Sequence, residues 1–133
     1  MNVADLSSHS LVKVEKSVSL REAAVELNRN EVGTVAVENS HGVMGIFSER
    51  DLARAVADEA DLDQVQVGEY MTESPVSVDF DAPVVEAIGL MHRFGVRHLI
   101  VAREDEPSGL VSARDVLRMF APDIARISQS RAS

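Results

Sequence analysis

The chain contains no cysteine. Disulfide bonds, thiolate catalysis and zinc sites with cysteine ligands are therefore excluded. It also has no apolar run approaching the roughly 20 residues that span a bilayer. Its first residues do not form a basic region followed by an apolar stretch, so no secretory signal is predicted. We expect a cytoplasmic protein with no membrane partner.

Positive charge is scarce as well. The sequence has 13 Lys and Arg against 22 Asp and Glu, a formal net charge of −9. This sign opposes broad, salt-dependent binding to nucleic acid phosphates, so we expect no nucleic acid partner. No nucleophile with an accompanying base, no phosphate-binding glycine-lysine loop and no metal-ligand spacing of histidines is present. We predict that the chain is not an enzyme, holds no metal and requires no cofactor.

What the chain does contain is one motif written twice. Gly-Ile-Phe-Ser-Glu-Arg-Asp at residues 45–51 returns as Gly-Leu-Val-Ser-Ala-Arg-Asp at residues 109–115, an offset of 64 positions. The same offset, without a gap, aligns residues 3–57 with residues 67–121. An offset that holds over a whole unit indicates an internal duplication. A chain of 133 residues would then form one compact domain shared by two small units.

The pattern of each unit predicts β-α-β-β-α. Alternating β-branched residues indicate strands at 11–14 and 75–78. Ser19 with Glu22 has the form of a capping box, and Asp81 with Pro83 gives the second helix its start signal. A hairpin and a last helix follow in each copy, and the apolar residues of the last helices are Leu52, Val56, Val116, Leu117 and Phe120. We predict an α/β (α+β) protein with a first repeat and its lead-in at 1–64, a second repeat at 65–122 and a tail at 123–133.

Each motif places Ser-x-x-Asp at the start of a helix. Helix capping explains this pattern by itself, since serine is a strong N-cap and an acidic group favours the first turn. A short aspartate held at a helix N-terminus would also suit the two neighbouring hydroxyls of a ribose. The helix amides would suit a phosphate. The residues alone leave capping and ligand binding both open.

In both copies of G-h-x-S-x-R-D, where h is apolar, the sequence resembles the paired CBS domain, or Bateman module, named after cystathionine β-synthase. Tyr70-Met71-Thr72 and the segment Gly95 to Val101 also carry the resemblance, which covers about Val3 to Ala121. It implies two repeats packed with pseudo-two-fold symmetry and clefts between them for adenosine-containing ligands.

The resemblance also implies roles for individual residues. Asp51 and Asp115 would accept from ribose hydroxyls, and Val12 and Val76 would line the adenine pockets. The residues expected to contact ribose or phosphate are Ser48, Ser112, Arg50, Arg114, Arg97, His98 and Thr34. Because Arg97 and His98 correspond to Gly33 and Thr34, the basic contribution is one-sided and one site should be the better anion site.

The function expected from this resemblance is sensing. A stand-alone CBS-pair regulatory module would bind an adenine nucleotide of the AMP, ADP or ATP type, or S-adenosylmethionine, and signal by conformational or oligomeric change. We expect a homodimer formed through exposed helices and a separate effector protein. The alternative is a dimerisation or protein-interaction scaffold without a ligand, in which both Ser-x-x-Asp motifs act only as caps.

Overall fold

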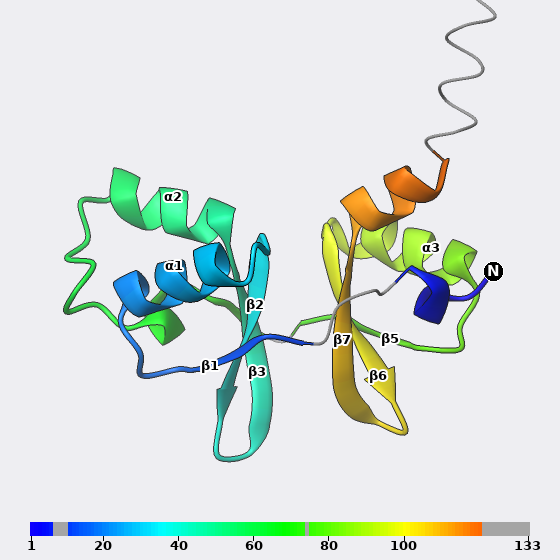
Figure 1. Cartoon of the computed structure of the whole chain (residues 1–133), viewed down its shortest axis with the longest axis horizontal. Helices are drawn as coiled ribbons and strands as arrows, with labels where there is room; N and C mark the ends of the chain where they lie inside the picture. The colour runs from blue at the N-terminus through cyan, green and yellow to red at the C-terminus, as the bar shows by residue number, and fades with distance from the viewer. Residues whose placement is uncertain (7–10, 74, 121–133) are drawn as a thin grey trace, which may run out of the picture. The chain divides into compact units, whose positions relative to one another are not determined.

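The structure is a computed structural model that describes residues 1–6, 11–73 and 75–120, and the predicted tail at 123–133 lies outside these ranges. The chain divides into two compact units (Figure 1). One comprises Leu11–Pro75, and the other comprises Met1–Ser10 with Val76–Ser133. The α/β fold class and the β-α-β-β-α pattern predicted from the sequence are confirmed.

The continuous unit carries a four-stranded sheet in the order β1-β2-β3-β4. Its elements are β1 (Lys13–Glu15), α1 (Leu20–Arg29), β2 (Thr34–Asn39), β3 (Gly42–Ser48), α2 (Glu49–Ala57), the 3-10 helix η2 (Val67–Glu69) and β4 (Thr72–Glu73). Strand β1 runs parallel to β2, and β2-β3 and β3-β4 are antiparallel pairs. Helix α1 packs against β2 and α2, and α2 packs against β3. Ser19 caps α1 as predicted, because its side chain accepts from the Glu22 amide at 3.1 Å.

The second unit carries a three-stranded sheet in the order β5-β6-β7. Its elements are the 3-10 helix η1 (Val3–Asp5), β5 (Ser77–Asp79), α3 (Val84–Phe94), β6 (His98–Arg103) and β7 (Glu106–Ser112). Residues 113–120 are helical. Helix α3 begins directly after Pro83, where the sequence places its start signal, and its N-cap makes no side-chain hydrogen bond. The β6-β7 connection is Glu104-Asp105, both at positive φ, which is the geometry of a two-residue hairpin turn.

The duplication seen in the sequence extends to details of the sheets. β1 and β5, β2 and β6, and β3 and β7 begin 64 positions apart. Both hairpins shift register at the same place, between Val37 and Glu38 in one and between Val101 and Ala102 in the other. In the second hairpin, the Ser108 hydroxyl donates to the Val101 carbonyl at 3.1 Å. A bulge that recurs at the same offset belongs to the repeated fold.

The segment that precedes each repeat packs in the core of the unit that contains the other repeat. Val3, in η1, is fully buried in the core of the second unit, and its amide donates to the Ala82 carbonyl at 2.8 Å. Val67, in η2, is fully buried in the core of the first unit, and its amide donates to the Val18 carbonyl at 2.8 Å. Each compact unit therefore combines the strands and helices of one repeat with the lead-in of the other.

Each unit has its own apolar core. On α1, Leu20, Ala23 and Leu27 recur at helical spacing and are all buried. Of the apolar residues named for the last helices, Val116 is buried and Leu52 is half-buried, whereas Val56, Leu117 and Phe120 are 57%, 60% and 40% exposed. No helix in the described ranges has the length and apolar character that a membrane crossing requires.

Candidate ligand-binding site

Each Ser-x-x-Asp motif is a capping box at the junction of a strand and a helix. Ser48 ends β3 and is the N-cap of α2. Asp51 Oδ2 accepts from the Ser48 amide at 2.9 Å and from its hydroxyl at 3.0 Å, and Ser48 Oγ accepts from the Asp51 amide at 3.2 Å. Ser112 and Asp115 repeat this arrangement at 2.8, 3.0 and 3.2 Å. The capping interpretation is thus correct for both copies.

Capping uses only one oxygen of each carboxylate. A carboxylate offers two oxygens and about four lone-pair directions, so Oδ1 is available to accept from a ligand hydroxyl. Asp51 is 7% exposed, and its Oδ1 lies 3.6 Å from Arg54 Nη2. Arg118, at the position that matches Arg54, forms no ion pair with Asp115, although both residues are described. Of the two Oδ1 atoms, that of Asp115 is therefore more available to accept a hydrogen bond from a ligand.

The hairpins bring further predicted residues to each motif. Thr34 stands opposite Ser48 in the β2-β3 ladder, and His98 stands opposite Ser112 in the β6-β7 ladder. Thr34 is buried. Within each unit, serine, aspartate and the Thr34 or His98 position thus gather at one end of the hairpin.

Val12 and Val76 lie beside the same hairpins. The Val12 carbonyl accepts from the Ala36 amide at 2.8 Å, and the Val76 carbonyl accepts from the Ile100 amide at 2.9 Å. Both side chains are half-buried and pack against the core of their own unit. These positions are compatible with the predicted adenine contacts, which stay a prediction.

The two motifs differ in the charge around them. Arg50, Arg114 and Arg97 are exposed, and none forms an ion pair with another residue in the described ranges. At Gly33, the position that matches Arg97, the Glu49 carboxylate lies 3.7 Å from the place that a Cβ would occupy. No sequence motif indicates this position of Glu49, which adds negative charge to the first copy. The charge around the two motifs therefore differs at Glu49 as well as at Arg97, and a better anion site in one copy stays a prediction.

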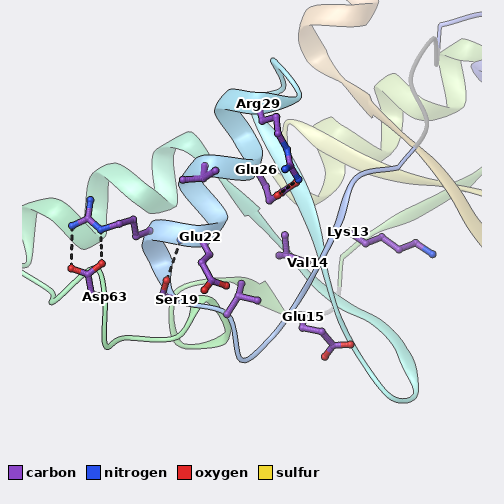
Figure 2. A pocket seen from close by; sticks show the side chains of 11 residues that line it. Lys13, Val14, Glu15, Ser19, Glu22, Glu26, Arg29 and Asp63 are labelled. Atoms are coloured by element: carbon purple, nitrogen blue, oxygen red, sulfur yellow. Dashed lines mark hydrogen bonds and ion pairs between the residues drawn. The ribbon is translucent and has the colours of Figure 1, made fainter.

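An open groove of about 750 Å³ lies elsewhere, between β1, the outer face of α1 and Asp63 (Figure 2). Val14 and Val18 contribute apolar surface, and Arg21 pairs with Asp63 by a hydrogen bond that lowers the pKa of this carboxyl. None of the residues predicted to contact a ligand, all of them described, lines this groove. The groove thus has no part in the motif-based site.

A further set of side chains joins the first motif to the segment leading toward the second repeat. Besides Asp51, the Arg54 guanidinium contacts Tyr70: Nη2 donates to the Tyr70 carbonyl at 2.9 Å, and the group lies 5.6 Å from the ring centroid. The Tyr70 hydroxyl donates to Asp58 Oδ2 at 3.0 Å. This hydrogen bond, with desolvation and the charge of Asp58, raises the pKa of Tyr70. Arg54 aligns with Arg118 at the 64-residue offset, but no sequence motif indicates this role.

Known proteins resemble this chain along most of its length. A protein from the bps2 3′ region of Acidianus ambivalens is 33% identical over 118 residues, which cover 87% of this chain and 71% of the relative. Arabinose 5-phosphate isomerase of Yersinia pestis is 33% identical over 106 residues, or 79% of this chain, but the match spans only 32% of the isomerase. A CBS domain protein of Pyrobaculum aerophilum, solved in complex with AMP, is 30% identical with a TM-score of 0.76, covering 86% of this chain and 89% of that one.

The repeats themselves are matched by one family. The family model of the CBS domain matches twice, at residues 3–58 and 67–122. These ranges contain both Ser-x-x-Asp motifs and reproduce the 64-residue offset of the duplication. The chain therefore belongs to the CBS domain family, in which it forms a pair of CBS domains.

Proposed function

We propose that this CBS pair is a regulatory module that binds an adenosine-containing ligand at its Ser-x-x-Asp motifs. The ligand class is AMP, ADP or ATP, with S-adenosylmethionine as a further member. Binding would favour one of two arrangements of the protein and so signal to a separate effector protein, because a ligand shifts a population only through differential affinity. The module itself performs no catalysis.

One observation carries this proposal: each buried or half-buried motif aspartate keeps one carboxylate oxygen outside its capping box. Oδ2 of Asp115 accepts both bonds from Ser112, which leaves Oδ1 for ribose hydroxyls. Exposed Arg97 and Arg114 supply positive charge on the same unit for phosphate. The AMP complex of the relative from Pyrobaculum aerophilum supports the same ligand class.

The second copy should bind more tightly than the first. Arg54 already occupies the surroundings of Asp51 Oδ1, and the Glu49 carboxylate lies where an anionic phosphate would be repelled. The second copy has Ala113 at the position of Glu49 and Arg97 at the position of Gly33. We therefore assign the principal site to Asp115.

The test compares AMP binding by the wild type, Asp115→Ala and Asp51→Ala, using calorimetry and thermal unfolding. AMP at about 100 times its dissociation constant should stabilise the wild type by roughly 2.7 kcal/mol. Asp115→Ala should lose this effect, while its ligand-free stability falls by only about 1 kcal/mol through the weakened cap. Asp51→Ala should lower the ligand-free stability by a similar amount, because it weakens the other cap, but it should retain most of the AMP binding.

The alternative is a scaffold that uses its motifs only as caps, which the complete capping boxes of both copies favour. A scaffold predicts the same loss of stability in Asp115→Ala without any response to AMP, ADP, ATP or S-adenosylmethionine in the wild type. That result would refute the sensing proposal.

Both candidate functions, the sensing module and the scaffold, include self-association. Helix α3 and the helix at 113–120 leave Val85 and Leu117 71% and 60% exposed, with Ile88 and Phe120 also exposed. Apolar side chains of this size on neighbouring helices of a small α/β unit favour cover by another protein surface. We propose that a second copy provides this cover in a homodimer.

A further inference from the structure

Arg54 connects the first motif to the segment at residues 67–73. Asp51, Arg54 and Asp58 lie on α2 or at its C-cap at i, i+3 and i+7, and thus on one face of the helix. Tyr70, the C-cap of η2, contacts this face at both Arg54 and Asp58. The segment continues into β4, which pairs with β3 at Gly45 and Ile46, and the chain then enters the second repeat.

The contacts of Arg54 with Tyr70 and with Asp51 depend on each other. Its Nη2 atom lies 2.9 Å from the Tyr70 carbonyl and 3.6 Å from Asp51 Oδ1, so one nitrogen interacts with both oxygens. The Arg54 side chain is 57% exposed, whereas that of Asp51 is 10% exposed. The aspartate is thus the more buried partner and the guanidinium the more exposed one, and both the aspartate and the Tyr70 carbonyl face the same nitrogen.

The second repeat does not have this arrangement. Arg118 matches Arg54, but the position of Tyr70 is Leu6 and the position of Asp58 is Pro122. Leu6 is an apolar member of the core of its unit. The contact is therefore a property of the first repeat and does not follow from the repeated fold itself.

We infer that Asp51, Arg54 and Tyr70 form a latch, in which the charge on the Asp51 carboxylate holds the segment at residues 67–73 against α2. Loss of this charge would leave Arg54 less ordered and weaken its bond to the Tyr70 carbonyl. A ligand whose hydroxyls donate to Asp51 Oδ1 would compete with Arg54 and loosen the same segment. This last step rests on the proposed function, whereas the latch itself does not.

The latch is tested without ligand by amide hydrogen exchange at Tyr70 and Met71, whose amides donate to the Val67 carbonyl. Asp51→Asn is the informative change, since asparagine keeps an oxygen for the Ser48 cap but removes the charge. We expect exchange at Tyr70 and Met71 to rise roughly two- to fivefold, the range that one partly exposed ion pair supports. Arg54→Gln should raise exchange by a similar factor.

The double variant decides between a latch and a general loss of stability. Asp51→Asn should add nothing to exchange at Tyr70 and Met71 once Arg54→Gln is present, because both act through one contact. Salt at about 1 M, where the Debye length is about 3 Å, should abolish the effect of Asp51→Asn. The matched control is Arg118→Gln, which should leave exchange at Tyr70 and Met71 unchanged.

Two results would overturn the inference: exchange that does not respond to Asp51→Asn, or a response that is as large with Arg54→Gln as without it. Neither result depends on whether AMP binds. Failure of the sensing proposal would therefore appear as absent AMP binding with the latch intact, and failure of the latch would appear as independent effects of Asp51 and Arg54.

Discussion

The glycine of the first motif is needed for close packing inside its own unit. Gly45 pairs with Glu73 in the β3-β4 ladder, and Ile46 pairs with Thr72. A Cβ at Gly45 would lie 2.6 Å from the Thr72 carbonyl oxygen and 2.8 Å from Met71 Sδ. The Met71 side chain can move, but the carbonyl belongs to the paired strand. An ordinary contact begins at 3.4 Å, so β4 would have to withdraw by about 0.8 Å.

Gly45→Ala should therefore weaken the attachment of β4. Lengthening two ladder hydrogen bonds at about 0.5–1.5 kcal/mol each gives a loss of about 1–3 kcal/mol, the usual range for an overpacked site. For a chain of this size we expect the Tm to fall by about 4–12 °C.

Gly89→Ala is the matched control for Gly45→Ala. A Cβ at Gly89 meets nothing within 4 Å, and the residue lies inside α3. Because alanine favours a helix over glycine, this change should stabilise the protein by up to about 1 kcal/mol. Thermal unfolding of both variants gives the comparison. If Gly45→Ala were as stable as the wild type, the packing explanation of the motif glycine would be wrong.

Two further predictions concern Tyr70 and the exposed helices. Tyr70 is the single tyrosine of the sequence, so absorbance at alkaline pH should report its titration alone, with a midpoint above the ordinary value near 10 that falls in Asp58→Asn. Because folding raises this pKa, the contribution of Tyr70 to stability should be complete below the pKa of the unfolded state. It should decline as the pH rises toward the pKa of the folded state. A titration midpoint that Asp58→Asn leaves unchanged would contradict the role of Asp58 in raising the pKa. Leu117→Asp, at a 60% exposed position, should halve the mass measured by sedimentation equilibrium and lower Tm only by the stabilisation that dimerisation contributes. A dimer that persists in both Leu117→Asp and Val85→Asp would show that these helices are not the interface.

The fold was predictable because the duplication repeats local signals. Strand alternation, the Ser19 cap and the apolar spacing of α1 act over a few residues, so the sequence contains them directly. The exposure of Val56 could not be predicted from local signals alone. Its size favoured burial, but Leu52 and the fully buried Ala55 define the inner face of α2, and a small residue gives a weak hydrophobic signal.

The features that the sequence did not reveal depend on long-range packing. The capping role of Ser48 and Asp51 was readable from their spacing, but the contact of Arg54 with Tyr70 joins residues 16 positions apart. The position of the Glu49 carboxylate over Gly33 likewise depends on the register of β2 and β3. Roles of the other ligand-site residues came from the family resemblance and stay predictions, because an acceptor oxygen does not identify the molecule that donates to it.

Because each lead-in packs in the unit of the other repeat, the two units become able to fold at different times during synthesis. The unit at Leu11–Pro75 is continuous, so all of its parts are available once residue 75 has left the ribosome. Val3 can pack only after the strand and turn around Val78 and Ala82 have been synthesised. The partners of its fully buried side chain and of its amide lie there. Such distant pairing is slow to form, and domains generally fold as their chains emerge. Val3 thus stays in water while the unit at Leu11–Pro75, which lies between it and its partners, folds.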